Sequence, residues 1–385
     1  MSSTEALAPA ASEKPDRRRD LDGLRGVAVL LTILFHYVTR AGYFSDLGPK
    51  PVALLLDSLW SGVDIFFVLS GFLIGGIILD NGRAENFLRV FYLRRALRIL
   101  PVAFLAIAFS YLIIPLLDPV IPWVGKVPPY AYLLFINNFW TASGLGTYPP
   151  LGPMWSLAIE QQFYLIAPAF LLLVNARTRN VVLLIVVLAS PFLRMCNLRF
   201  SPWDFTLFRF DGFSVGILVA VLLRDAGFRR FAVQYRRTIS SIAIGLMVAA
   251  LLFTVCPDLS PRERTAFGIT LNSLAAGGVI FFLHLNREST LSRALSQRWL
   301  AVTGKFSYFL YLMHLPFLAY AAVAGLPMLM QPVVALGVSL VGAWISWRFL
   351  ESRLIAIGQR VSYLQPNALA GASPQLTQPV YWRQS

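Results

Sequence analysis

Three titratable residues interrupt long apolar runs of this sequence, where they could perform acid–base chemistry. They are His36 in the first run, Asp64 five residues into the second and Glu160 six residues into the fourth. A charged side chain in a hydrocarbon environment is costly and needs a partner or a function. A histidine near a carboxylate is a standard general base, because the carboxylate orients the ring and stabilises its charged form. The alternative for each residue is a hydrogen bond or ion pair that serves packing alone.

The first apolar run also contains Arg25, eleven positions before His36. Eleven residues are close to three helical turns, so both side chains share one helix face, about 16 Å apart along the axis. Arg25 would then lie near the cytoplasmic surface and His36 in the outer half of the membrane. Asp64 and Glu160 fall at about the same depth as His36, which favours a shared site.

A second group of basic residues, Arg94, Arg95 and Arg98, opens the third apolar run. Arg95 and Arg98 are three positions apart and therefore share a helix face. Guanidinium groups suit phosphates, and coenzyme A (CoA) carries a pyrophosphate and a 3′-phosphate. The alternative is that these arginines only anchor the helix at the cytoplasmic surface.

Small and polar residues mark two further runs. Ser70 and Gly71 lie in the otherwise bulky run 66–72, where they allow another helix to approach closely or leave room for a narrow ligand arm. In the ninth run, Tyr308 and His314 fall at helical spacing with two further hydroxyl residues. His314 is predicted to be a hydrogen-bonded core histidine.

The elements that must position these residues are membrane helices. Of 385 residues, 57% are hydrophobic and 14% are charged, whereas soluble domains have roughly 25% charged residues. Apolar runs of about 18–22 residues recur, each sufficient to cross a hydrocarbon core. The sequence therefore predicts an all-α polytopic membrane protein with about ten transmembrane helices. Their expected ranges are 24–39, 59–79, 97–116, 154–174, 180–195, 210–223, 239–256, 267–285, 306–325 and 331–350, and a partial helix is expected at 130–140.

The basic residues predict the orientation, because Lys and Arg of short loops are retained in the cytoplasm. With the N-terminus inside, 25 of the 33 basic residues fall on the cytoplasmic side and eight on the other. Both termini are therefore predicted to be cytoplasmic. The net charge of +14 then lies beside anionic lipid headgroups, so the lipid bilayer is the expected partner and nucleic acid is not.

Three parts are expected along the chain: a disordered cytoplasmic N-terminus over 1–19, a transmembrane domain over 20–355 and a cytoplasmic tail over 356–385. The first segment lacks the apolar core of a signal peptide, so the first helix is expected to be retained. Cys196 and Cys256 both fall near outward helix ends. A disulfide between them is geometrically possible, and two unpaired thiols are the alternative.

Five motifs, in this order, resemble the acyltransferase 3 family across about residues 20–355. They are Asp22-Gly23-Leu24-Arg25-Gly26 followed by His36, the run Phe66–Phe72, Arg95-x-x-Arg98-x-x-Pro101, Trp155-Ser156-Leu157-x-x-Glu160-x-x-Phe163-Tyr164, and Ser307-Tyr308-x-x-Tyr311-x-x-His314. The C-terminal motif of the family is usually Glu-x-Pro. It reads Glu351-Ser352-Arg353 here, so its proline is missing.

The resemblance implies transfer of an acyl group, commonly acetyl, from cytoplasmic acyl-CoA to a hydroxyl of an envelope or exported saccharide or a small natural product. The protein would be a multi-pass protein of the bacterial inner membrane. Acyl-CoA would be a co-substrate, with no permanently bound cofactor and no metal. Many relatives carry a fused extracytoplasmic hydrolase-like domain that this sequence lacks, so a second transfer step is expected to need a separate partner.

The same resemblance makes the first-run arginine and histidine essential and assigns the glutamate of the fourth motif a role. The predicted catalytic residues are His36, Glu160, Asp64 and Arg25, and the predicted acyl-CoA-binding residues are Arg25, Arg95, Arg98 and Ser70. The pantetheine arm would thread upward from the arginines. His36 would then deprotonate the acceptor hydroxyl or carry the acyl group itself, and both routes stay open.

Two other classes of function stay open. A proton-coupled transporter would explain the intramembrane histidine and carboxylates, but it would not explain the paired arginines, and no inverted repeat is visible. A scaffold subunit would tolerate the loss of His36. Acyl-CoA-dependent labelling of a product discriminates among the three classes.

Overall fold

The computed structural model describes residues 18–40, 50–117, 127–196, 199–256 and 258–365, and these residues form helices and turns without a strand. Nine described segments are long and apolar enough to cross a membrane. Their main helices are α1 (Arg19–Phe35), α3 (Gly62–Asn81), α4 (Phe87–Ala108), α8 (Met154–Leu173), α9 (Ala176–Cys196), α12 (Arg236–Val255), α13 (Pro261–Leu285), α15 (Arg298–Val323) and α16 (Met330–Ser346). A further apolar helix, α10 (Phe210–Leu222), is shorter. The prediction of an all-α polytopic membrane protein with about ten transmembrane helices is confirmed.

Short helices and turns join or prolong the long ones. The short α-helices are α2 (Lys50–Asp57), α5 (Ile114–Leu117), α6 (Pro129–Leu133), α7 (Asn137–Ala142), α11 (Ala226–Gln234), α14 (Thr290–Leu295) and α17 (Ser352–Gln359). The 3₁₀ turns are η2 (Ser58–Ser61), η4 (Pro149–Leu151) and η5 (Thr206–Phe208), and the π-helical segments are η1 (His36–Arg40), η3 (Phe109–Ile113) and η6 (Trp347–Glu351). Single π-helical turns within α-helices are frequent at functional sites.

Several helices begin or end outside the predicted ranges, because an apolar run stops at the hydrocarbon edge whereas a helix continues until it is capped. α13 begins at Pro261 instead of 267: the Ser260 hydroxyl accepts the Glu263 N–H at 3.2 Å, and the Glu263 side chain caps in return. The last helix continues through α17 to Gln359, past the predicted boundary at 355.

The segment predicted as a partial helix at 130–140 folds as two short helices, α6 and α7. Phe135 lies between them with a positive φ of 53°, a conformation that breaks a helix. The predicted disorder of residues 1–19 falls almost entirely outside the described residues, and so does the part of the tail after residue 365.

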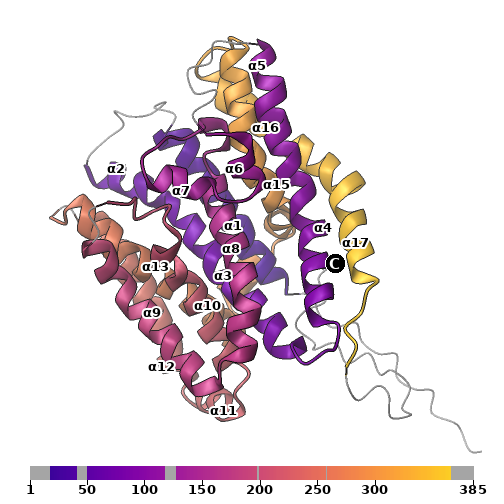
Figure 1. Cartoon of the computed structure of the whole chain (residues 1–385). Helices are drawn as coiled ribbons and strands as arrows, with labels where there is room; N and C mark the ends of the chain where they lie inside the picture. The colour runs from indigo at the N-terminus through magenta and orange to yellow at the C-terminus, as the bar shows by residue number, and fades with distance from the viewer. Residues whose placement is uncertain (1–17, 41–49, 118–126, 197–198, 257, 366–385) are drawn as a thin grey trace, which may run out of the picture.

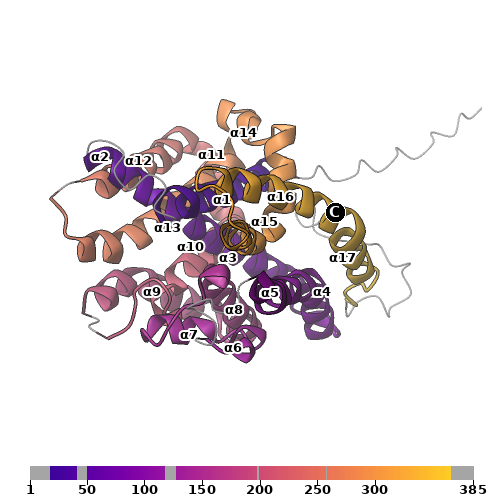
Figure 2. The ribbon, with the colours of Figure 1, turned by 90° about the horizontal axis from the view of Figure 1, so that it is seen from above.

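The centre of the bundle consists of α1, α3 and α15, as the end-on view shows (Figure 2). α10 packs along α3, and α16 packs along α15. At the rim, α9 and α16 expose apolar side chains such as Leu188 and Val341, which suits contact with lipid. Helices α2, α5 and α6 lie at one end of the bundle and α11 at the other (Figure 1). We name the first of these the His36 end, and the second, where α1 begins, the Arg25 end.

Glycines let the central helices approach until their backbones touch. A Cβ atom on Gly304 of α15 would overlap the carbonyl oxygen of Asp22 on α1. A Cβ atom on Gly71 of α3 would overlap the carbonyl oxygen of Phe213 on α10. Small residues at such crossings are a usual means of packing membrane helices. The first of these contacts holds Arg25 beside α15.

Gly304→Ala is expected to destabilise the protein by about 1–3 kcal/mol, because the added methyl group forces α1 and α15 apart. Gly337→Ala on α16 is the matched control, since nothing lies within 4 Å of its Cβ position, and it reports the intrinsic gain of Ala over Gly in a helix. Thermal unfolding of the detergent-solubilised protein measures both. Equal stability of the two variants would contradict the close contact.

Candidate active site

A pocket between α1, α3, α8 and α15 contains several predicted site residues. About 570 Å³ of space free of protein atoms lies among these helices, part of it open to the outside. Its lining residues are Arg25, Val63, Phe66, Phe67, Leu69, Ser70, Leu73, Ser156, Leu157, Glu160, Ser307, Tyr308 and Tyr311. Because α3 contributes Val63 toward the His36 end and Leu73 toward the Arg25 end, the pocket extends about 15 Å along the bundle.

Glu160 lies within this pocket beside Ser70. Its Oε1 atom accepts hydrogen bonds from the Ser70 hydroxyl and the Tyr164 hydroxyl. The Arg95 guanidinium lies over the Tyr164 ring, 5.5 Å from its centroid. The structure thus brings three predicted site residues into one cluster. Among the described residues, no hydrogen bond joins Glu160 to His36.

The pocket is positively charged toward the Arg25 end. Arg25 lines it, and the buried Nε atom of Arg25 has no hydrogen-bond partner among the described residues. Arg98 interacts electrostatically with both Arg25 and Arg95. Three cations held this close repel one another, so a bound anion would relieve the repulsion. The three arginines predicted to bind acyl-CoA therefore lie together.

Two further residues of this region had no assigned role in the sequence analysis. Glu351 ends a π-helical segment, is buried, accepts a hydrogen bond from the Ser346 hydroxyl at 2.7 Å and interacts with Arg98. Tyr308 lines the pocket and donates to the carbonyl oxygen of Ile99 at 2.7 Å. A carboxylate at the end of an apolar run was the signal that could have identified Glu351.

His36 lies beside the pocket lining, at the far end from the arginines. Its Nδ1 is 2.8 Å from the carbonyl oxygen of Thr32 and 3.2 Å from Nε2 of His314. His314 is completely buried (0% exposed) and follows Tyr311, whose hydroxyl is 2.5 Å from that of Ser156. The predicted core histidine is therefore also the direct neighbour of the predicted base.

Asp64, predicted to assist His36, is paired with a different residue. Its Oδ1 forms an ion pair with Nη2 of Arg209 at 2.5 Å, and both side chains are 1% exposed. Arg209 also lies over the rings of Phe67 and Trp155, 5.1 and 5.6 Å from their centroids. A buried guanidinium needs a counter-charge, and Asp64 supplies it. The structure thus gives Asp64 an ion-pair partner other than His36, and its catalytic role stays a prediction.

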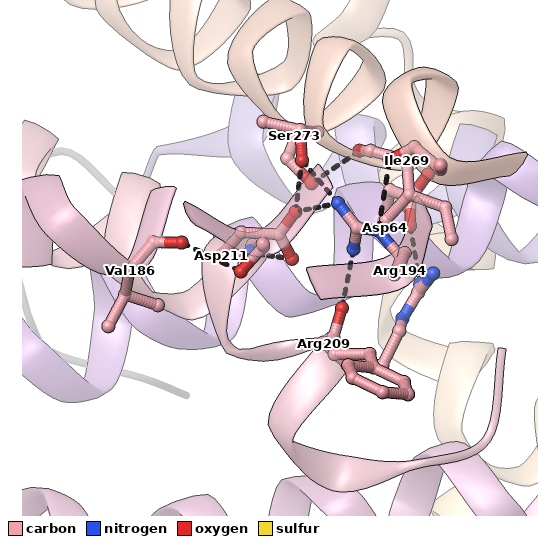
Figure 3. A network of polar contacts seen from close by, with 12 residues as sticks. Asp64, Val186, Arg194, Arg209, Asp211, Ile269 and Ser273 are labelled. Atoms are coloured by element: carbon pink, nitrogen blue, oxygen red, sulfur yellow. Dashed lines mark hydrogen bonds and ion pairs between the residues drawn. The ribbon is translucent and has the colours of Figure 1, made fainter. Parts of the chain in front are cut away.

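A second buried ion pair continues this network (Figure 3). Arg194 bonds to Asp211 at 2.8 Å, and it also donates to Thr270 and to the carbonyl oxygens of Phe208 and Ala266. Together the two pairs join α3, α9, α10 and α13. Arg194 and Arg209, near the ends of the fifth and sixth predicted helices, are thus core residues.

Cys196 and Cys256 are both free thiols, so the disulfide that the sequence permits is not formed in the structure. Among the described residues, no group of three or more His, Cys, Asp or Glu side chains could hold a metal ion.

A family model described as an acyltransferase domain matches residues 18–348 of this chain. The chain belongs to the acyltransferase 3 family. This match confirms the family suggested by the five motifs, and it includes every helix that contributes to the pocket. The acyltransferase 3 domain of this protein places motif residues from four helices, Arg25, Ser70, Glu160 and Tyr308, in the lining of one pocket.

The chain is similar to the O-acetyltransferase OatA of Staphylococcus aureus, with 28% identity over 356 residues, or 86% of this chain and 56% of that protein. It is also similar to the peptidoglycan O-acetyltransferase OatA of Listeria monocytogenes, with 26% identity over 359 residues, or 86% of this chain and 55% of that protein. This acyltransferase 3 chain thus spans about half the length of the curated relatives it matches. No solved structure matches it.

Proposed function

We propose that this protein is an integral membrane O-acyltransferase of the bacterial inner membrane. It moves an acyl group, acetyl by our expectation, from cytoplasmic acyl-CoA to a hydroxyl of an envelope saccharide. The observation that carries the proposal is a pocket lined by Arg25, Glu160 and Tyr311. Arg95 lies near it through Tyr164, and His314 lies beside Tyr311. The acyltransferase 3 match and the names of the relatives, O-acetyltransferase and peptidoglycan O-acetyltransferase, support it.

The arginine cluster is the proposed donor site. Arg25, Arg95 and Arg98 would bind the phosphates of CoA, because guanidinium groups form paired hydrogen bonds with phosphate oxygens. The pantetheine arm would lie along the pocket, past Ser70 and Glu160. Its length is roughly that of the separation between Arg25 and His36, about 16 Å. The thioester carbonyl would then lie near the His36 end.

At the His36 end, His36 would act as the base. It takes the proton of the acceptor hydroxyl while the hydroxyl oxygen attacks the thioester carbonyl carbon. The carbon–sulfur bond then breaks, and the sulfur leaves as CoA with the proton returned by His36. In the second route Nε2 of His36 attacks the thioester carbonyl carbon first, the carbon–sulfur bond breaks and CoA leaves as the thiolate. The acceptor hydroxyl then attacks the acyl-histidine, its proton goes to the thiolate, and neutral imidazole is released. Both routes require the same neutral imidazole.

The orientation follows from the distribution of basic residues. With the Arg25 end in the cytoplasm, the donor site lies where acyl-CoA is made, and the His36 end opens toward the envelope. The acceptor would then approach from outside, and the acyl group would cross most of the membrane inside the protein. A saccharide of the cell wall is the acceptor class that the name of the Listeria monocytogenes relative favours.

Purified protein in lipid nanodiscs is expected to release CoA from acetyl-CoA and to transfer labelled acetyl to soluble peptidoglycan fragments. Arg98→Lys keeps the charge but loses the guanidinium fork, so the KM for acetyl-CoA should rise about tenfold, the value of a lost charge-assisted hydrogen bond. Arg230→Lys on α11 is the control, because Arg230 is an exposed arginine on a cytoplasmic helix by our prediction.

The outcomes separate the functions. CoA release and label transfer that weaken only in Arg98→Lys support the enzyme. If acyl-CoA of any chain length neither binds nor turns over, the enzyme proposal fails and the transporter alternative becomes the better explanation.

A further inference from the structure

The two imidazoles at the His36 end have tautomers that their backbone neighbours determine. Nδ1 of His36 is 2.8 Å from the carbonyl oxygen of Thr32, and Nδ1 of His314 is 3.0 Å from the carbonyl oxygen of Leu310. A carbonyl oxygen only accepts hydrogen bonds, so each Nδ1 must carry its proton. In both neutral rings the lone pair is therefore on Nε2.

This assignment gives the contact between the rings a direction. Nε2 of His314 is 3.2 Å from Nδ1 of His36, so the lone pair of His314 accepts the Nδ1–H that Thr32 also shares. His36 is then left with its own lone pair on Nε2, the nitrogen that can take a proton. The Nδ1–H group of His36 thus has two acceptors, the Thr32 carbonyl oxygen and Nε2 of His314, and together they orient the ring.

The His314 side chain is itself held in place and is inaccessible to solvent. Its ring is completely buried, its Nδ1–H is bonded to Leu310, and its backbone oxygen accepts the hydroxyl of Tyr37 at 3.0 Å. A buried nitrogen lone pair without a donor would be costly, and the His36 N–H satisfies it. The pair thus has a defined geometry before any substrate binds.

We propose that His314 is the positioning residue of His36 and takes the place of the carboxylate in a Ser-His-Asp-type arrangement. Its Nε2 keeps His36 in the tautomer that is basic at Nε2. When His36 Nε2 accepts the proton of the acceptor hydroxyl, the resulting imidazolium shares its Nδ1–H with two acceptors, Thr32 and His314. A neutral partner does this without placing a second charge in the membrane. The inference rests on the proposed function.

The test uses three substitutions of His314 that differ in whether they place a hydrogen-bond acceptor beside Nδ1 of His36. His314→Gln keeps an acceptor oxygen at the ε position, His314→Asn ends one atom short of it, and His314→Leu has no acceptor. With acetyl-CoA and a peptidoglycan fragment, we expect kcat within about threefold of wild type for Gln and about a hundredfold lower for Asn and Leu. The KM for acetyl-CoA should stay within about twofold, because the donor cluster is untouched.

Equal losses in Gln and Asn, or full activity in Leu, would overturn the inference. If Leu fails to fold, the comparison of Gln with Asn decides, since both are polar and close in volume. If the wild-type protein does not turn over acyl-CoA, the proposed function fails, and not the inference about His314. In that case ¹⁵N spectra of the histidines still test the contact: a His36 Nδ1 resonance that shifts more in His314→Asn and His314→Leu than in His314→Gln supports it, and equal shifts in all three variants overturn it.

Discussion

His36→Ala is expected to lower acyl transfer by about 10²- to 10⁴-fold, the usual contribution of a general base. The reason is geometric: His36 lies beside the pocket, and the only imidazole that the described residues place against it, His314, is completely buried. Acyl-CoA binding should be unchanged, because Arg25, Arg95 and Arg98 remain. The loss should therefore appear in kcat and leave KM for acetyl-CoA unaltered.

His284→Ala is the matched control for this prediction. His284 lies near the Arg25 end of α13, where its Nδ1 is 3.1 Å from Nη1 of Arg18. Single-turnover release of CoA, measured beside equilibrium binding of a non-hydrolysable acyl-CoA analogue, distinguishes loss of chemistry from loss of binding. Near-wild-type turnover by His36→Ala would rule out both the general-base route and the acyl-histidine route.

The second large effect concerns stability. Arg209→Met is expected to cost about 3–5 kcal/mol, because it leaves the Asp64 carboxylate buried without its cation. The double variant Asp64→Leu with Arg209→Met removes both charges, and its stability should return close to that of wild type. Thermal unfolding in detergent measures the recovery, and failure of the double variant to recover would contradict a mainly structural ion pair.

Acetyl transfer by the same double variant tests the catalytic role predicted for Asp64. If turnover recovers with stability, Asp64 serves packing. If stability recovers and turnover does not, Asp64 has the catalytic role that the sequence predicts for it.

The sequence predicts which residues lie within membrane helices better than it predicts which way their side chains point. Counting residues from a helix end correctly predicts that His36, Asp64 and Glu160 lie within membrane helices, because the rise per residue is constant. It does not tell which side of each helix faces which neighbour. The rotation of each helix about its own axis depends on contacts between helices, such as that of Gly304 with α1. In the packed structure Asp64 points toward Arg209 and Glu160 points toward Ser70.

The helix count was predictable for a related reason: long apolar runs have few alternatives in a membrane. The arginine cluster was also predictable, since Arg95 and Arg98 are close in sequence. The contact between His36 and His314 was not, because it joins residues 278 positions apart and depends on how α1 and α15 are rotated. Only the packed structure contains that information.

The short length of α10 has a consequence for where this helix can stand in the bundle. Its 13 residues cover about 20 Å, whereas the hydrocarbon layer is about 30 Å thick. The chain before it carries Arg209 inward to Asp64 rather than continuing as an apolar helix. Because most of the residues of α10 are buried, mainly against α3, α9 and α13, its length does not have to match the thickness of the lipid. The polar chain that precedes α10 can lie at membrane depth for the same reason, because protein rather than lipid surrounds most of its backbone.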